Sequence, residues 1–568
     1  MILKGNPVSP GIAVGKAYLY KAFACDVSEA YFEKGYEANY IGIFEEALAQ
    51  ARRELEDMIA SFAEEDADKA KIFIAHREML HDEEILDCIR DAIVNGKKRP
   101  DFAVNSVFGE FIQLLAKAKN PLIAARTADL CDVRNRLLRV LRGEKEKNLS
   151  ALPKNVIVVA HDLLPSDTAT IDRAHVAGII TEAGGFTSHT AIIARSYQIP
   201  AVLGVSRAAE VLTDGALLAL DAVAGEITVA PSEEVLEQSR KKSNVFKKQC
   251  EAVKKYLGKP AKTADGESVE IGINISSDKF DIPAENYDTV GLFRTEFLYM
   301  ENDHLPTEEE QFEAYKRVLK NAAGKTVTLR TLDIGGDKTL PYMQLPKEDN
   351  PFLGKRALRL CLDHPDIFST QLRAALRASA FGTLQMMFPM VGSMDDIRRA
   401  KAAVCAAKEQ LSAEGKAFNE NIKLGIMIEI PSVAAIADLA AEEVDFASVG
   451  TNDLVQYLCA VDRMNPEVSG YYQGLCPAVL RVLGFIFEQF NAKGKPISVC
   501  GELAGDPAAA VVMVGLGLRK LSMIEANLAR VKAALAGITM EKAHVLGTAC
   551  KNLATEAEVK AYLQENQL

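Results

Sequence analysis

Residues 269–523 alternate eight times between a short apolar run and a helical segment. This alternation restricts the possible folds more than any other feature of the chain, because short apolar runs that alternate with helices are typical of a parallel sheet with crossover helices. Eight such units in about 300 residues predict a TIM (β/α)8 barrel. The expected strands are residues 269–275, 290–293, 327–329, 384–389, 424–428, 446–449, 496–499 and 520–523.

The part of the chain before this barrel predicts a multidomain α/β protein. Strand-like runs occupy residues 1–22 and 146–227, and helical periodicity fills 23–145 between them. We therefore expect a β/α domain into which a helical bundle is inserted. A charged helix is expected over 232–256, within a linker region at 228–260, and a polar stretch at 258–268 leads into the barrel domain, which spans 261–568. Among the expected helices of the bundle are residues 41–62, 68–80, 83–95 and 124–141.

Composition and charge exclude several classes of protein. The 568 residues carry a net charge of −12, which argues against a nucleic-acid partner or an anionic membrane surface. No apolar run reaches the length of about 18 residues that a membrane span needs. The ten cysteines include no C-x-x-C pair. We therefore expect reduced thiols in a cytoplasmic protein rather than a zinc site or a disulfide framework.

The segment GGFTSHTAIIAR, residues 184–195, combines a glycine loop with the start of a helix. It follows an apolar run at 176–180 and places His189 in the first helical turn, where free N–H groups and the helix dipole favour an anion. An imidazole there can accept a phosphoryl group as a covalent intermediate. An exposed histidine at an ordinary strand–loop–helix turn is the alternative that this segment alone leaves open.

Polar side chains follow the predicted barrel strands at the end where barrel enzymes hold their reactive groups. Several arginines there suit an anion that carries phosphate or carboxylate, because guanidinium presents a planar fork to either group. Glu429 and Asp453 follow neighbouring strands and suit Mg²⁺, which takes one or two protein carboxylates. Cys500 is either a reactive thiol or part of the core packing. The candidate substrate-binding residues are Arg294, Arg330, Arg356, Asn452, Asp453 and Arg463.

For any single arginine or acid in this set, a surface ion pair is the alternative. The whole set at successive strand ends favours catalysis instead. A barrel site that combines arginines with magnesium ligands, together with a histidine in a separate domain, suggests phosphoryl transfer. This reaction relies on positioning and charge neutralisation.

Three motifs resemble the signatures of the phosphoenolpyruvate-utilising enzymes: GGFTSHTAIIAR, DFASVGTNDLVQY and CGELAGD. Within this family the chain is similar over essentially its whole length to enzyme I of bacterial sugar phosphotransferase systems. Further shared motifs include SPGIAVGKA, GLFRTEFLYM and NPFLGKRALR. The resemblance implies that the phosphoryl group of phosphoenolpyruvate passes to His189 and then to a histidine of the carrier protein HPr, with release of pyruvate.

The resemblance also implies roles for individual residues. Arg294 and Arg330 would bind the phosphate, and Asn452 and Arg463 would assist at phosphate and carboxylate. Glu429 and Asp453 would bind magnesium. Cys500 would protonate the enolate carbon, and Thr168 would lie beside the histidine. The helical insert corresponds to the HPr-docking subdomain, in which Arg126 would lie near the incoming phosphoryl group. The family forms homodimers through the barrel domain.

His189 must face the barrel to be phosphorylated and the bundle to pass the group on, so the β/α domain is predicted to swivel about the linker helix. Three alternatives share parts of the pattern. An enzyme like pyruvate phosphate dikinase would need an ATP-binding domain before His189, where the chain has no glycine-rich phosphate loop. A magnesium-dependent barrel lyase or aldolase would have no use for His189. A non-catalytic phosphoenolpyruvate sensor would not need the complete set of reactive groups.

Overall fold

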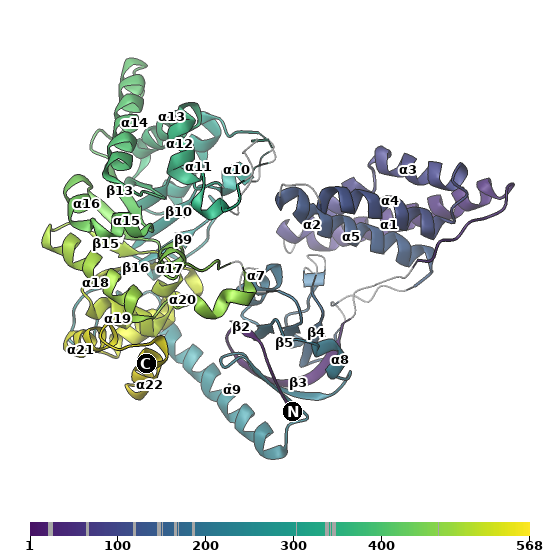
Figure 1. The fold of residues 1–568 in the computed structure, drawn as a ribbon, viewed down its shortest axis with the longest axis horizontal. Coiled ribbons are helices and arrows are strands. Elements are labelled where there is room, and N and C mark those ends of the chain that lie inside the picture. Colours follow the sequence, from purple (N-terminus) through teal and green to yellow (C-terminus); the bar gives the residue numbers. More distant parts are fainter. Residues whose placement is uncertain are drawn as a thin grey trace. The chain divides into compact units, whose positions relative to one another are not determined.

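The computed structural model describes residues 1–20, 27–63, 67–116, 121–144, 149, 152–163, 167–168, 170–184, 188–300, 302, 304–335, 340, 342–343, 348–463 and 465–568. The chain forms two compact units, residues 1–248 and 249–568 (Figure 1). None of the helices in the described ranges is long and apolar enough to cross a membrane.

An eight-stranded mixed sheet lies in the first unit, with the strand order β1-β8-β7-β3-β4-β5-β6-β2. Strands β3 to β6 are parallel neighbours in this order, and β3 pairs with β4 although the helical residues separate them in the sequence. Such pairing is expected of a β/α domain with an inserted bundle. The exact limits of the domain and of the insert, as given from the sequence, stay predictions. The strands are β1 (Ile2–Lys4), β2 (Asn6–Ser9), β3 (Ile12–Leu19), β4 (Val156–Ala160), β5 (Val176–Thr181), β6 (Ala201–Leu203), β7 (Leu217–Asp221) and β8 (Glu226–Val229).

Both faces of this sheet are covered, because successive side chains of a strand point to opposite sides. Val158 belongs to the apolar cluster that α7 (His189–Ser196) covers. Its neighbour Val159 belongs to the cluster on the other face, with α8 (Ala208–Val211). The sheet is therefore the middle layer of an α/β domain, and α7 rests on one face of it.

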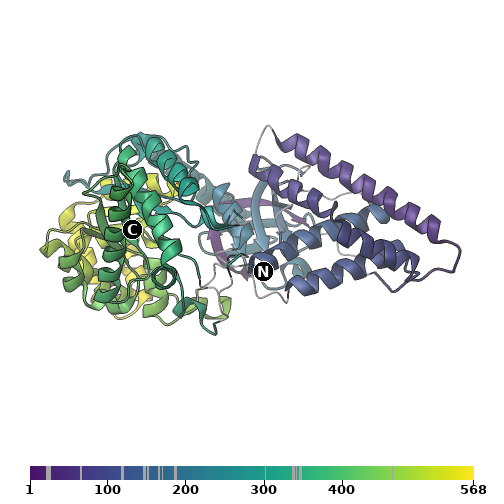
Figure 2. The same cartoon turned by 90° about the horizontal axis from the view of Figure 1, so that it is seen from above.

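Among the described residues, five helices form the bundle and lie side by side (Figure 2). Phe44, Leu48, Ile89, Phe108 and Leu137 are all fully buried in its core. Four of the helices match the predicted segments, whereas α4 was not among those singled out. The five are α1 (Glu37–Ala63), α2 (Ala67–Met79), α3 (Glu83–Val94), α4 (Pro100–Ala116) and α5 (Pro121–Leu141).

The charged linker helix is α9 (Glu233–Lys254), close to the predicted range. Its first part is fastened to the sheet domain, because Ser243 Oγ donates a hydrogen bond of 2.7 Å to the Ile12 carbonyl oxygen. The boundary between the two compact units falls within this helix.

The second unit is a closed barrel of eight parallel strands, which confirms the predicted fold. Each predicted strand is present, with ends that differ by no more than a residue or two. The strands are β9 (Glu270–Ile275), β10 (Thr289–Arg294), β11 (Val327–Arg330), β12 (Leu384–Phe388), β13 (Lys423–Ile428), β14 (Phe446–Val449), β15 (Ile497–Val499) and β16 (Lys520–Met523).

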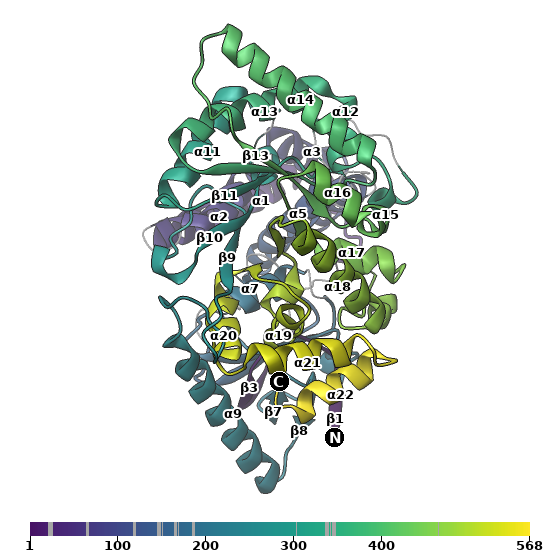
Figure 3. The same ribbon diagram turned by 90° about the vertical axis from the view of Figure 1, so that its left-hand side faces the viewer.

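Helices surround these strands (Figure 3), and apolar residues of strands and helices share one large core. Those that follow β10 to β12 are α10 (Phe297–Met300), α11 (Glu308–Asn321), α12 (Ala357–Asp363), α13 (Pro365–Ala378) and α14 (Met394–Ala413). Those that follow β13 to β16 are α15 (Pro431–Ala435), α16 (Ala437–Glu443), α17 (Thr451–Leu458), α18 (Pro477–Ala492), α19 (Pro507–Gly515), α20 (Glu525–Ala536), α21 (Met540–Cys550) and α22 (Glu556–Glu565).

Candidate active site

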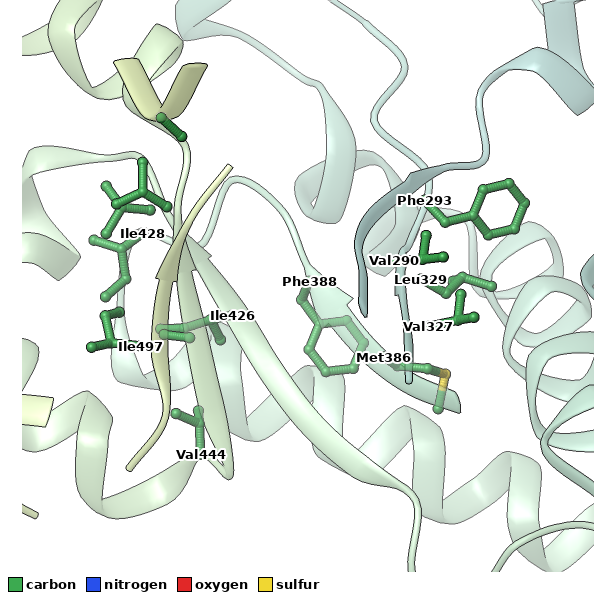
Figure 4. Close-up of a cluster of buried hydrophobic side chains, with 14 of the residues drawn as sticks. Val290, Phe293, Val327, Leu329, Met386, Phe388, Ile426, Ile428, Val444 and Ile497 are labelled. Carbon is green, nitrogen blue, oxygen red and sulfur yellow. The ribbon is translucent and has the colours of Figure 1, made fainter. Parts of the chain in front are cut away.

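The alternation of side chains along the barrel strands decides which residues reach the interior. Val290, Phe293, Val327 and Leu329 belong to the large core shared with the surrounding helices (Figure 4). A register irregularity between Val290 and Phe293 lets both face outward in β10, and the residues that alternate with the outward side chains point into the barrel. The same alternation turns the polar side chains at the ends of β10, β11 and β13 inward at the barrel mouth. A separate interior cluster consists of Leu292, Met387, Met427, Phe446 and Cys500.

Arg330 is buried at the end of β11 between two carboxylates. Its Nη2 donates to Glu296 Oε1 at 3.0 Å, and its Nη1 lies 2.9 Å from Asp333 Oδ2. Burial disfavours the charged form, but these carboxylates outweigh burial and raise the pKa of Arg330. The Nε–H has no hydrogen-bond partner among the described residues. One donor of this fixed guanidinium is therefore available to an anion.

Arg356 extends this chain of alternating charges. Its Nη2 donates to both carboxylate oxygens of Asp333, at 2.9 and 3.1 Å, and its Nη1 donates to Asp453 Oδ1 at 3.3 Å. Arg463 Nη2 lies 3.6 Å from the same Asp453 oxygen. Paired carboxylates hold a planar guanidinium in one orientation. Three arginines that the sequence singled out thus lie in one connected network.

Arg294 differs from these three arginines because no carboxylate among the described residues contacts it, although Glu296 and Asp333 lie near enough to attract its charge. In the described part of the chain its guanidinium has no hydrogen-bond or ion-pair partner, although the side chain is half-buried. Burial and repulsion from Arg330 lower the pKa of Arg294. A cation held without a carboxylate costs the folded protein free energy. Arg294 is therefore a candidate residue for binding an anion.

Glu429 supplies a carboxylate that is fully buried after β13. Its Oε1 accepts a hydrogen bond of 2.6 Å from the Met390 N–H, whereas Oε2 has no partner among the described residues. Burial, followed by repulsion from Asp453 and Asp333, raises the pKa of Glu429 to about 8. The described residues contain no group of three or more His, Cys, Asp or Glu side chains arranged for a metal. Glu429 Oε2 and the nearby Asp453 nevertheless fit Mg²⁺, which fills its other positions with water and substrate oxygens.

Removing the Glu429 charge should flatten the pH dependence of stability in the metal-free protein. Because its folded-state pKa of about 8 lies above the ordinary value of 4.5, the folded protein binds this proton more tightly than the unfolded chain. The resulting stability is fully present below the ordinary pKa and is lost as the pH rises toward 8. Between about pH 5 and pH 8, we expect the free energy of unfolding to fall by roughly 3 kcal/mol more in the wild type than in Glu429→Gln. Urea unfolding with a chelator measures both slopes, and equal slopes would contradict the assignment.

Cys500 follows β15 and faces the barrel interior. Its Sγ lies 3.7 Å from the Val449 carbonyl oxygen, and burial raises the pKa of the thiol, so that it is protonated at neutral pH. Just beyond it, the Glu502 N–H donates a hydrogen bond of 2.9 Å to Asn452 Oδ1. This contact fixes the Asn452 side chain at the start of α17, beside the loop that carries Cys500.

In the amino-terminal unit, α7 begins at His189, which confirms the predicted helix start. The Ser188 side chain caps the helix by accepting a hydrogen bond of 3.2 Å from the Ala191 N–H. The remaining N–H groups of the first turn have no carbonyl partner within the helix. The backbone at His189 therefore has the geometry that favours an anion.

Thr168 is buried in the same domain. The Leu163 carbonyl oxygen accepts a hydrogen bond of 3.5 Å from Thr190 Oγ1, so Leu163 lies against the start of α7. The side chains of His189 and Arg126 lie outside the described residues. The roles predicted for these residues therefore stay predictions.

Three family models match successive parts of the chain. They are described as the N-terminal domain (residues 4–126), the mobile domain (152–225) and the PEP-binding domain (250–540) of PEP-utilising enzymes. The mobile-domain match contains α7, and the PEP-binding match contains all eight barrel strands.

Individual relatives match almost from end to end. The phosphoenolpyruvate-protein phosphotransferase of Bacillus subtilis (strain 168) is 41% identical over 566 residues, which cover 99% of each chain. That of Staphylococcus carnosus (strain TM300) is 42% identical over 571 residues, which cover 99% of this chain and 98% of the relative. The chain belongs to the phosphoenolpyruvate-protein phosphotransferase family.

Two carboxylates that organise the barrel mouth of this phosphotransferase were not among the predicted site residues. Glu296 accepts hydrogen bonds from Arg330 Nη2 and from the Asp333 N–H, the latter at 3.2 Å. Asp333 joins Arg330 to Arg356. Both acids follow a barrel strand by two or three residues, and Glu296 lies in the motif GLFRTE. This position was the available signal, since a carboxylate there is needed to hold the arginines.

Gln371, on α13, was also missed. It is fully buried, and its Nε2 donates to Thr295 Oγ1 at 3.1 Å while its Oε1 accepts from the Leu332 N–H at 2.8 Å. Thr295 Oγ1 in turn donates to the Arg330 carbonyl oxygen at 3.0 Å. One amide from the outer helical layer thus fixes the carboxyl ends of β10 and β11 in the phosphotransferase barrel. No sequence signal identifies it, because a glutamine within an amphipathic helix is usually exposed.

Proposed function

We propose that the protein transfers the phosphoryl group of phosphoenolpyruvate to His189 and then to a histidine of the phosphocarrier protein HPr, as the first step of a sugar phosphotransferase system. The barrel mouth carries this proposal. Arg294 has no hydrogen-bond or ion-pair partner among the described residues, and the nearby Arg330 keeps one free donor. Together they form a cationic site prepared for a small phosphate-bearing anion.

In the proposed reaction, Arg294 and Arg330 hold the phosphate of phosphoenolpyruvate, and Asn452 and Arg463 assist at the phosphate and carboxylate. A nitrogen of His189 attacks phosphorus, the bond from phosphorus to the enol oxygen breaks, and the phosphoryl group moves to the imidazole. The fixed guanidinium groups neutralise charge on the transferring oxygens without reorganising. The network through Arg356 keeps them in place.

Glu429 and Asp453 are the residues that would hold Mg²⁺, and the ion would polarise substrate oxygens and favour the enolate. Arg356 donates to Asp453 Oδ1 and thereby fixes the orientation of that carboxylate. Glu429 would bind in its deprotonated form. Its pKa of about 8 therefore predicts that metal affinity increases as the pH rises through this range.

Cys500 completes the reaction by donating its thiol proton to the enolate carbon, which yields pyruvate, and the thiolate regains a proton from water. Cys500→Ala should lower kcat about 100-fold with little change in KM, because the thiol donates a proton but does not hold the phosphate. Steady-state formation of pyruvate in the presence of HPr measures this effect. Cys550→Ala, which removes another buried thiol, is the matched control and should retain wild-type kcat. A change confined to KM would contradict the assigned role.

The proposal includes docking of HPr on the helical bundle, a swivel of the domain that carries His189, and a homodimer formed through the barrel. Intact-protein mass at neutral pH tests its central step. After incubation with phosphoenolpyruvate and Mg²⁺, we expect one added phosphoryl group that is labile to acid and is removed by HPr. ATP in place of phosphoenolpyruvate should add none. Bound phosphoenolpyruvate without any mass gain would overturn the proposal in favour of a barrel lyase or a sensor.

A further inference from the structure

Two cysteines lie at the two ends of the loop that carries Arg463. Cys459 is the residue that ends α17, and Cys476 is the residue that precedes α18. The two helices are in contact (Figure 3). Both thiols are free and half-buried. They are therefore separated in the sequence but carried by neighbouring helix ends.

The Cys459 and Cys476 side chains interact directly with each other. A turn brings them together: the Gln473 backbone lies against the Cys459 thiol, and the Gln473 carbonyl oxygen accepts a hydrogen bond of 3.3 Å from the Cys476 N–H. Both side chains also pack on the large barrel core. The proximity of the two thiols makes a disulfide between them the bond to test.

The loop between these cysteines contacts the candidate active site at two points. Arg463 Nη2 lies 3.6 Å from Asp453 Oδ1, and the Tyr472 hydroxyl donates a hydrogen bond of 3.2 Å to the Asn452 carbonyl oxygen. In the proposed reaction Arg463 binds substrate while Asp453 holds Mg²⁺. The pair seen in the structure must therefore loosen, which requires the loop to adjust relative to α17.

We propose that Cys459 and Cys476 are a peroxide-sensitive pair whose disulfide fastens the Arg463 loop to α17 and slows phosphoryl transfer. The Cys476 sulfur attacks hydrogen peroxide, the O–O bond breaks, and a sulfenic acid and water result. The Cys459 sulfur then attacks the sulfenic sulfur, the S–S bond forms, and a second water leaves. Two thiols and one peroxide thus give one disulfide and two waters. A dithiol reductant reverses the change by thiol–disulfide exchange.

The position of Cys476 favours the first step. It is the N-cap residue of α18, and its half-buried sulfur is open to peroxide from water. Cys459 makes the second attack at short range, where its contact with Cys476 replaces a diffusive encounter. By contrast, Cys361, Cys500 and Cys550 are buried, and burial slows their reaction with peroxide in water.

Peptide mapping of the full-length protein tests the bond itself. After treatment with hydrogen peroxide and alkylation of the remaining thiols, trypsin cleaves at Arg463 and so separates the two cysteines. We expect their peptides to remain joined, two hydrogens lighter than the sum of the free peptides, and to separate on addition of dithiothreitol. Fully alkylated peptides at peroxide levels that oxidise the exposed Cys88 and Cys405 would overturn the proposal.

The expected effect on activity rests on the proposed function, whereas formation of the disulfide does not. Peptide mapping therefore tests the bond even if the proposed function is wrong. We expect peroxide to lower the rate of phosphoryl transfer from phosphoenolpyruvate to HPr about tenfold, and dithiothreitol to restore it. Cys476→Ser should keep the basal rate and resist this loss. Equal inhibition of the variant would place the sensitive thiol elsewhere, for example at Cys500, and overturn the regulatory role. Joined peptides with an unchanged rate would overturn it as well.

Discussion

His189→Ala should acquire no phosphoryl group from phosphoenolpyruvate, and its transfer to HPr should fall below about one part in 10⁴ of the wild-type rate. The side chain is the acceptor itself, so no neighbouring group can replace it. Its helix should remain, because the Ser188 cap and the packing of α7 on the sheet do not depend on the imidazole. Intact mass and a coupled assay of pyruvate release measure the two losses.

His175→Asn is the matched control for this variant. His175 precedes β5, whereas His189 follows it, so the two histidines lie toward opposite ends of that strand. The Nδ1 of His175 lies 2.9 Å from Asp172 Oδ2, in the turn that precedes the strand. The control should therefore accept one phosphoryl group per chain. If His189→Ala were still phosphorylated while the control behaved as wild type, another acceptor would carry the reaction.

The barrel was predictable from the sequence because each strand is a short apolar run bounded by polar loop residues. Its inward and outward side chains are both largely apolar, as in β13, so the runs stand out against the amphipathic helices. Helix α4 was harder to identify for the same physical reason. Val104, Phe108, Phe111 and Ile112 form one apolar stripe, but Phe102 and the exposed Leu114 lie outside it, which weakens the helical periodicity.

The site residues that directly follow a strand were predictable from the sequence. Arg330 and Glu429 follow apolar runs directly, so their inward direction follows from strand alternation. Contacts between distant segments carry no such signal. Asp333 joins two arginines, and Gln371 reaches back from α13 to the ends of two strands. These partners depend on tertiary packing, which a single sequence does not display.

The unpaired state of Arg294 leads to the second prediction with a large effect. Arg294→Met should lower kcat/KM for phosphoenolpyruvate about 10³-fold, because it removes a fixed cation from the transferring phosphate. The same change should leave the thermal midpoint of the ligand-free protein unchanged or higher, since no carboxylate loses a partner and a costly buried charge disappears. Thermal unfolding and steady-state kinetics on the same preparation measure both effects.

Arg330→Met is the contrasting variant that makes this test decisive. It should lose comparable activity and also about 3 to 5 kcal/mol of stability, because it leaves the buried Glu296 and Asp333 carboxylates without their shared cation. Arg398→Met, which removes an exposed arginine from α14, should change neither activity nor stability appreciably. If Arg294→Met were destabilised as strongly as Arg330→Met, Arg294 would have a structural partner and would not be held ready for an anion. Loss of activity without loss of stability in Arg294→Met would instead show that the folded protein keeps the Arg294 charge, without an ion-pair partner, for its substrate.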